Sequence, residues 1–155
     1  MIDCMAVLKI TTYSAKETQK VARLLAREIL RSDIQRDGAL AIALEGDLGG
    51  GKTTFSQGFA KGLGIREKIL SPTFVIMKSF RFHASGFRKF VHIDAYRLSG
   101  ANELRPLGWK DILQDKNAIV LVEWADRVRR ALPKGYVRIQ FEFVDKKTRK
   151  IKINS

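Results

Sequence analysis

The sequence predicts an α/β fold with a largely parallel central sheet, helical layers on its faces and antiparallel hairpin additions. Three patterns lead to this prediction. Residues 41–44 form a short apolar strand, followed by a glycine-rich stretch and an amphipathic helix, which is the order of a β-α unit. Residues 118–123 are apolar up to their last position and are expected to form a central, buried strand. Residues 136–144 and 149–154 alternate apolar and polar positions and indicate a terminal hairpin with one solvated face.

The N-terminal part of the chain predicts a strand followed by a helix. Residues 5–12 alternate loosely, as a strand does. Ser14 and Glu17 have the spacing of a capping box, in which each side chain satisfies a backbone N–H group at the start of a helix. The face of this helix that is expected to contact the core consists of Val21, Leu24, Leu25 and Ile29.

The middle of the chain predicts a hairpin and a less regular segment. Pro72 forces an extended conformation on the residue before it and introduces a β-branched and aromatic strand at residues 73–82. A turn around Ser85-Gly86 leads to a second strand at residues 90–94. Residues 100–116 are interrupted by proline and glycine, so they are expected to form a short helix or an irregular segment.

The glycine-rich stretch matches the phosphate-binding loop pattern G-x-x-x-x-G-K-[ST] at every fixed position. The matching residues are Gly46, Asp47, Leu48, Gly49, Gly50, Gly51, Lys52 and Thr53. In such a loop, successive backbone N–H groups curl around the β-phosphate of a nucleotide, and glycines leave room for its approach. Lys52 is expected on the β- and γ-phosphates, the Thr53 hydroxyl on Mg²⁺, and Thr54 beside them in the nucleotide site.

The residues after the loop predict the helix that a phosphate-binding loop requires. Apolar residues recur every four positions, at Phe55, Phe59 and Leu63. Gly64 follows at the position of a left-handed cap. Gly58 and Gly62 flank the apolar stripe, which indicates close packing of this helix on a sheet. Strand, loop and helix in this order predict a P-loop NTPase three-layer sandwich.

Two strand-end carboxylates, Asp94 and Glu123, are candidates for the acid that a phosphate loop needs near Mg²⁺. Either is expected to hold Mg²⁺ through water or to polarise the attacking water. The alternative for each is a structural pair with a nearby arginine. His83 and His92 lack partners at metal-ligand spacing, so a structural or hydrogen-bonding role is favoured for them. Trp124 belongs either to the core or to the nucleotide pocket.

Composition indicates a globular protein with an unusual charge. A chain of 155 residues, 45% hydrophobic and 29% charged, fits one domain over residues 1–155. The single cysteine, Cys4, excludes an internal disulfide, and no apolar run reaches membrane-span length, so the cytoplasm is expected and a membrane is not. The net charge of +13 and pI of about 10.2 indicate attraction to polyanions, RNA first, or else reflect a generally basic proteome or solubility alone.

Four short motifs occur in order along the chain. They are the phosphate loop, then Ser71-Pro72-Thr73-Phe74, then His92-x-Asp94-x-Tyr96-Arg97, and then Glu123-Trp124. In this combination the chain resembles the TsaE (YjeE) family, small bacterial ATPases of tRNA threonylcarbamoyladenosine biosynthesis. The resemblance covers about residues 10–145 and is far more specific than the phosphate loop alone.

The resemblance implies an ATP hydrolase that depends on Mg²⁺ and is slow alone. Its activity is stimulated in a complex with the threonylcarbamoyl transferase (TsaD-like) and the inactive paralogue of that transferase (TsaB-like). The complex attaches threonylcarbamoyl to adenosine 37 of tRNAs that read codons beginning with A. Contact of this chain with tRNA is expected to be indirect or through a weak basic surface.

The resemblance also implies roles for individual residues. Lys52 and Thr53 bind phosphate and Mg²⁺, with Lys52 counted among the catalytic residues. Glu123 is the acid on the Mg²⁺ side, and Asp94 is the second catalytic candidate. Trp124 lies near the nucleotide. A switch-like loop consists of Ser71, Pro72, Thr73 and Phe74. From the residues alone, a turn at a strand entry explains the hydroxyls of Ser71 and Thr73 better than a switch does.

Two other functions are compatible with the residues. A small-molecule kinase shares the loop and the size of this chain, although no acceptor-binding motif or arginine-rich lid is evident in the sequence. A basic RNA-binding protein would use ATP only as a switch ligand. Transfer of phosphate to a small molecule would identify the kinase. Intact tRNA modification without ATP hydrolysis would identify the RNA-binding protein.

Overall fold

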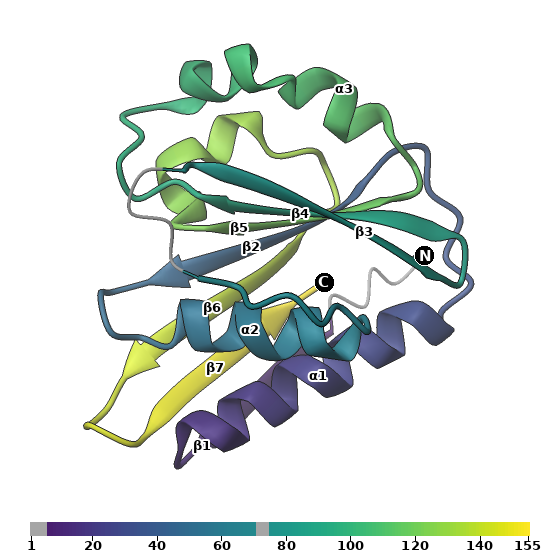
Figure 1. Cartoon of the computed structure of the whole chain (residues 1–155). Coiled ribbons are helices and arrows are strands. Elements are labelled where there is room, and N and C mark those ends of the chain that lie inside the picture. The colour runs from purple at the N-terminus through teal and green to yellow at the C-terminus, as the bar shows by residue number, and fades with distance from the viewer. Residues whose placement is uncertain (1–5, 71–74) are drawn as a thin grey trace.

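A mixed β-sheet organises the chain, and helical segments cover both of its faces (Figure 1). The computed structural model describes residues 6–70 and 75–155. The strands in these ranges are β1 (Val7–Thr12), β2 (Leu40–Gly46), β3 (Met77–Ala84), β4 (Phe87–Asp94), β5 (Ala118–Glu123), β6 (Val137–Phe143) and β7 (Arg149–Asn154). The helices are α1 (Ala15–Arg31), α2 (Lys52–Gly62) and α3 (Trp109–Gln114), with the 3-10 helices η1 (Ala101–Leu107) and η2 (Ala125–Ala131). None of these helices combines the length and apolarity needed to span a membrane.

The centre of the sheet is parallel and its edges are antiparallel, which confirms the predicted α/β fold class. The strand order is β1-β7-β6-β2-β5-β4-β3, in which β6, β2, β5 and β4 pair in parallel. The hairpins β3-β4 and β6-β7, together with β1 on β7, supply the antiparallel pairs. Parallel strands end at the same edge of a sheet, so the residues that follow β2, β4 and β5 lie close together there.

Strand β5 is buried on both faces, as its apolar run predicts. Ile119 and Leu121 belong to the core formed with α1 and α2, whereas Val120 and Val122 belong to the core on the opposite face. That second core includes residues of α3 and both 3-10 helices. Helical layers on both faces of the sheet give the expected three layers (Figure 1) and explain why β5 has no polar residue before Glu123.

The contact between α1 and α2 corrects one detail of the prediction. Gly58 and Gly62 face α1 and not the sheet. A Cβ atom at Gly58 would lie 2.4 Å from the carbonyl oxygen of Gln19, and one at Gly62 would lie 2.7 Å from Ala26 Cβ. The two glycines therefore allow a close approach of two helices. A small-residue stripe packs closely on either a helix or a sheet, so the sequence does not distinguish the two partners.

Helix α1 begins as predicted, but its buried face is different. The Glu17 N–H donates to Ser14 Oγ (3.1 Å), and Glu17 Oε2 accepts from the Tyr13 N–H (2.7 Å). The buried residues of α1 are Thr18, Ala22 and Ala26. Leu24, which was expected in the core, is 51% exposed. Small residues are buried here because α2 lies so close, and the larger Val21, Leu25 and Ile29 are only partly buried at the margin.

Strands β3 and β4 form the predicted hairpin with shifted boundaries. Ser85 (φ 50°) and Gly86 (φ 87°) form the turn between them in left-handed conformations. The strand expected at residues 73–82 begins at Met77, and the second strand extends back to Phe87. Helices η1 and α3 occupy the segment that was expected to be a short helix or irregular.

Candidate functional site

A cleft of about 380 Å³ contains most of the predicted site. Its lining consists of Leu48, Gly49, Gly50, Gly51, Lys52, Thr53, Thr54, Asp94, Tyr96, Glu123, Trp124 and Arg149. The glycine loop connects β2 to α2 at the carboxyl edge of the parallel strands. Asp94 ends β4 and Glu123 ends β5, and these two residues are register partners. The sheet therefore brings together motifs that are far apart in the sequence.

The loop between β2 and α2 has a backbone that glycine adopts most easily. Gly46, Gly49 and Gly51 have φ angles of 140°, 77° and 99°. A Cβ atom at Gly46 would lie 2.4 Å from the carbonyl oxygen of Phe141. Left-handed residues in such a loop turn successive N–H groups toward one concave side, and the first turn of α2 adds its own N–H groups. The left-handed glycines are compatible with the predicted phosphate-binding loop, in which the Gly50 N–H donates to the Asp47 carbonyl (3.0 Å).

Lys52 lies at the start of α2 with its ammonium group folded onto the loop. Only 4% of the residue is exposed. Its Nζ donates to the carbonyl oxygens of Gly46 (2.6 Å) and Asp47 (2.8 Å) and lies 3.9 Å from the centre of the Trp124 ring. Burial lowers the pKa of this ammonium group, and nearby carboxylates, Glu123 foremost, oppose the shift. A largely buried cation beside the glycine loop suits an anionic ligand.

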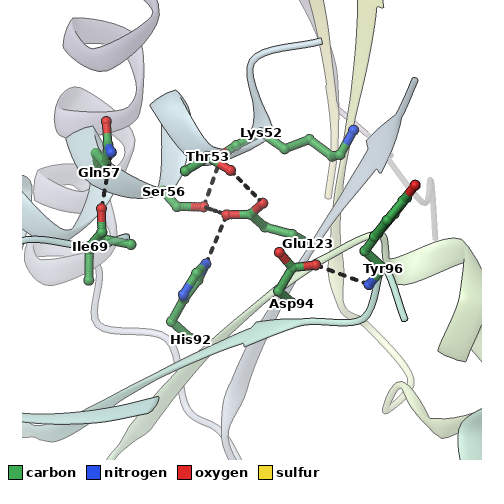
Figure 2. A network of polar contacts seen from close by, with 9 residues as sticks. All are labelled: Lys52, Thr53, Ser56, Gln57, Ile69, His92, Asp94, Tyr96 and Glu123. Atoms are coloured by element: carbon green, nitrogen blue, oxygen red, sulfur yellow. Dashed lines mark hydrogen bonds and ion pairs between the residues drawn. The ribbon is translucent and has the colours of Figure 1, made fainter. Parts of the chain in front are cut away.

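The Glu123 carboxylate is the centre of a buried hydrogen-bond network (Figure 2). The residue is 1% exposed. Its Oε2 accepts from Thr53 Oγ1 (2.9 Å), and its Oε1 accepts from Ser56 Oγ (2.8 Å) and lies 2.8 Å from His92 Nε2. The hydrogen-bonding role expected for His92 is confirmed. Within residues 6–70 and 75–155, the side-chain partners of Glu123 are hydroxyls and an imidazole rather than an arginine.

The hydrogen-bond network determines the ionisation state of the Glu123 side chain. Burial opposes the charged carboxylate, but the hydrogen bond and charge of His92, followed by the hydroxyls of Ser56 and Thr53, outweigh it. The pKa of Glu123 therefore lies below its ordinary value. At neutral pH the site holds an ionised carboxylate in a fixed orientation against the first turn of α2.

Asp94 and two aromatic residues form the outer part of the cleft. The Tyr96 N–H donates to Asp94 Oδ1 (3.0 Å), which fixes the turn after β4. The ring of Tyr96 lies 4.9 Å from that of Trp124, and the Arg127 guanidinium lies 5.2 Å from the first ring and 5.6 Å from the second. Trp124 combines the two positions that the sequence allowed, because it lines the cleft and also packs against the core formed with η1, α3 and η2.

Trp124 has a left-handed backbone, with φ 57° and ψ 40°. This conformation costs a non-glycine residue about 1–2 kcal/mol. Adjacent hydrogen bonds hold it in place, because the Arg127 N–H donates to the Trp124 carbonyl (3.1 Å) and the Ala95 N–H donates to the Glu123 carbonyl (3.0 Å). Strain of this kind concentrates at functional sites. Here it accompanies an indole ring that lies against the Lys52 ammonium.

The oxygen atoms beside the loop fit a magnesium ion. Thr53 and Glu123 offer a hydroxyl and a carboxylate oxygen 2.9 Å apart, and Asp94 lies on the neighbouring strand end. Magnesium prefers oxygen ligands and keeps several of its waters, so one or two protein oxygens are sufficient. The donor set and the shape of the loop therefore suit a nucleotide triphosphate together with its metal ion.

Ser56 and Arg149 belong to the site although no motif includes them. Ser56 follows Thr53 by three residues on one helix, and that spacing is the sequence signal that places both hydroxyls on the same face. Arg149 reaches the cleft from the start of β7, a position that depends on the strand order. The expected switch-like residues Ser71, Pro72, Thr73 and Phe74 lie outside the described residues.

Sequence and fold are both similar to one protein family. Residues 12–151 match the family described as threonylcarbamoyl adenosine biosynthesis protein TsaE. Relatives named tRNA threonylcarbamoyladenosine biosynthesis protein TsaE are 37% identical in Bacillus subtilis, over 87% of this chain and 77% of the relative, and 36% identical in Nostoc, over 98% and 90%. The crystal structure of YdiB from Bacillus subtilis matches with a TM-score of 0.74 at 30% identity, over 99% of this chain and 88% of that one. The chain belongs to the TsaE family.

Proposed function

We propose that this protein is a P-loop ATPase, built as one domain, that acts in tRNA threonylcarbamoyladenosine biosynthesis, the process for which its family is named. The observation that supports ATP chemistry is the 2.9 Å contact between the Thr53 hydroxyl and the Glu123 carboxylate. These side chains are 70 positions apart in the sequence, yet they meet at the end of the glycine loop. They are the kinds of oxygen donor that a nucleotide-bound metal ion uses.

Different residues of the cleft have different roles in ATP hydrolysis. The loop N–H groups bind the β-phosphate, and Lys52 exchanges its contacts with the Gly46 and Asp47 carbonyls for contacts with the β- and γ-phosphates. Thr53, and Glu123 directly or through water, would hold Mg²⁺, whose charge would offset that of the phosphate oxygens. Asp94 lies on the neighbouring strand end, where it orients the attacking water.

The cleft supports slow turnover in the isolated chain. An arginine finger accelerates phosphoryl transfer by about 10³–10⁵-fold. Arg149 lines the cleft, but its guanidinium donates to the carbonyl oxygens of Asp145 and Thr148 in its own hairpin. Faster hydrolysis therefore requires a partner, a role that we assign to a TsaD-like transferase and its TsaB-like paralogue. Because the substrate of that pathway is tRNA, we expect the protein to act in the cytoplasm.

Phosphate release from ATP and Mg²⁺ by the purified chain tests this proposal. We expect slow release by the chain alone, faster release with the transferase pair, and loss of release in the Glu123→Gln variant. ATP labelled in its γ-phosphate distinguishes hydrolysis from the kinase alternative. If the label entered a small molecule faster than it was released as free phosphate, the protein would be a kinase and the proposed hydrolysis would be contradicted. If Glu123→Gln stopped hydrolysis but left tRNA modification intact, ATP would be only a switch ligand, as in the RNA-binding alternative.

A further inference from the structure

A second hollow lies on the face of the sheet opposite α1 and α2, between η1, the start of α3, and η2. Its volume is about 900 Å³. The charged residues that line it are Arg105, Lys110, Asp126, Arg127, Arg129 and Arg130. Five cations and one carboxylate line this hollow, which we call the basic groove, and one of the cations, Arg129, is paired with Glu45, so a net positive charge remains.

Buried contacts hold the walls of the basic groove in place. Glu45 is 5% exposed and accepts hydrogen bonds from Arg129 (3.1 Å) and Arg138 (2.8 Å). The Trp109 Nε1–H donates to the Ala131 carbonyl (2.9 Å), which ties the start of α3 to the end of η2. The Arg129 side chain is still 52% exposed, and a guanidinium has five N–H donors, so donors are left for a ligand. The groove is therefore formed before any ligand binds.

The basic groove differs from an ordinary solvated surface because it is concave. Exposed cations such as Lys20 and Arg27 lie along the outer side of one helix, α1, and face solvent. In a groove, the fields of several like charges add and are focused between low-dielectric walls. Asp126, and Glu45 through its pair with Arg129, offset part of the charge of the five cations, and an anionic occupant would reduce the repulsion that remains.

We propose that the basic groove binds the phosphate backbone of RNA. Four of its five cations are arginines, whose planar guanidinium groups bind phosphate oxygens in pairs. The net charge of +13 extends the attraction to a polyanion beyond the groove itself. The inference rests on the proposed role in tRNA modification, which makes tRNA the relevant RNA, but it does not depend on ATP hydrolysis.

Arg127, a residue of the basic groove, contacts two residues that line the nucleotide cleft. Arg127 lines the groove and also lies over the rings of Tyr96 and Trp124. The Trp124 ring in turn lies 3.9 Å from the Lys52 ammonium of the glycine loop. An RNA backbone in the groove is therefore connected to the nucleotide cleft through the contact between Arg127 and the Trp124 ring.

Binding of an unmodified tRNA transcript to the full chain, measured by fluorescence anisotropy at several salt concentrations without partner proteins, tests the proposal. The double variant Arg105→Glu, Lys110→Glu reverses two exposed charges of the groove outside the nucleotide cleft. The double variant Lys20→Glu, Arg27→Glu makes the same change of net charge on the opposite face. We expect the groove variant to bind at least about tenfold more weakly and to lower the salt slope by about 2, since each phosphate contact contributes about 0.9. The α1 variant should keep the wild-type slope.

Two results would overturn the proposal. Equal weakening in the groove and α1 variants would show that net charge alone attracts RNA. Unchanged tRNA affinity in the groove variant would exclude an RNA site there, and loss of association with the transferase pair in that case would indicate an acidic protein surface as the occupant. If circular dichroism shows that the groove variant does not fold, Arg105→Gln, Lys110→Gln takes its place, with the same expected loss of slope.

ATP hydrolysis by the same proteins separates this inference from the proposed function. Intact hydrolysis with weakened tRNA binding in the groove variant supports the groove as an RNA site that is distinct from the nucleotide cleft. Absence of hydrolysis in the wild-type protein, even with the transferase pair, together with tRNA binding that depends on the groove, contradicts only the proposed ATPase activity.

Discussion

Replacing Glu123 with glutamine perturbs the centre of the site, because the change removes a charge and keeps the shape. The carboxylate is within 2.8–2.9 Å of Thr53, Ser56 and His92. A hydrogen bond to a charged group contributes about 1.5–3 kcal/mol to stability, and a neutral one about 0.5–1.5 kcal/mol. The glutamine amide keeps one acceptor oxygen for Ser56 and His92 and presents its NH₂ group to Thr53, whose hydroxyl turns to accept.

The expected loss of stability in Glu123→Gln follows from the same contacts. The pKa of Glu123 is below its ordinary value despite burial, so folding favours the charged form, and a neutral replacement lowers the free energy of unfolding. Relief of the burial cost offsets part of the weakened bonds, which leaves an expected loss of about 1–2 kcal/mol. For a chain of this size, that loss lowers the melting temperature by about 2–8 °C.

The loss of stability in Glu123→Gln is expected to depend on pH. A carboxylate whose pKa is depressed in the folded state stabilises the protein above its unfolded-state pKa of about 4.3, and the stabilisation disappears as the pH falls through the folded-state pKa. The difference between wild type and Glu123→Gln is therefore complete at neutral pH and shrinks below about pH 4.3. Calorimetric melting at neutral and acidic pH measures it, with Glu67→Gln, at an exposed position, as the matched control. Equal melting temperatures at neutral pH, or a gap that widens in acid, would refute this reasoning.

Three further predictions concern the loop and the helix pair. Lys52→Ala should weaken ATP binding by about tenfold or more, since a charge-assisted hydrogen bond contributes about 1.5–3 kcal/mol; unchanged affinity in calorimetry would exclude the lysine from the phosphate site. ATP should change the tryptophan fluorescence, because the Lys52 ammonium leaves the Trp124 ring, and no change should occur in Trp124→Phe; a response that survives this substitution would place the reporter elsewhere. Gly58→Ala should cost about 1–3 kcal/mol in urea denaturation, because its Cβ would lie 2.4 Å from the Gln19 carbonyl, whereas Gly100→Ala, with open space around it, should cost little; equal costs would contradict the close helix contact.

The glycine loop and its flanking elements could be predicted from the sequence because their signals are local. The apolar strand, the turn glycines and the four-residue spacing of Phe55, Phe59 and Leu63 each depend only on neighbouring positions. The boundaries of β2 and α2, and the left-handed φ of 87° at Gly64, agree with those signals. The strand-end positions of Asp94 and Glu123 were also predicted, because Glu123 follows an apolar run and Asp94 follows a run that is apolar except for His92.

The contact between His92 and Glu123 could not be predicted, because it depends on which strands are neighbours. His92 contacts Glu123 only because β4 pairs with β5, and no local pattern fixes that order. Arg149 lines the cleft only because β7 lies beside β6, which in turn lies beside β2. The positive charge was visible in the composition, but its concentration in one groove depends on how η1 and η2 pack together. These contacts depend on which elements are neighbours in the fold, and local sequence patterns do not specify that.

The central claim is that the nucleotide cleft serves the formation of threonylcarbamoyladenosine in tRNA. The most direct test is mass spectrometry of this nucleoside in tRNA from cells whose only copy of the protein carries Glu123→Gln. We predict that the nucleoside falls to background in these cells and stays at the wild-type level in cells that carry Glu67→Gln. A wild-type level with Glu123→Gln, at equal protein abundance, would contradict the claim.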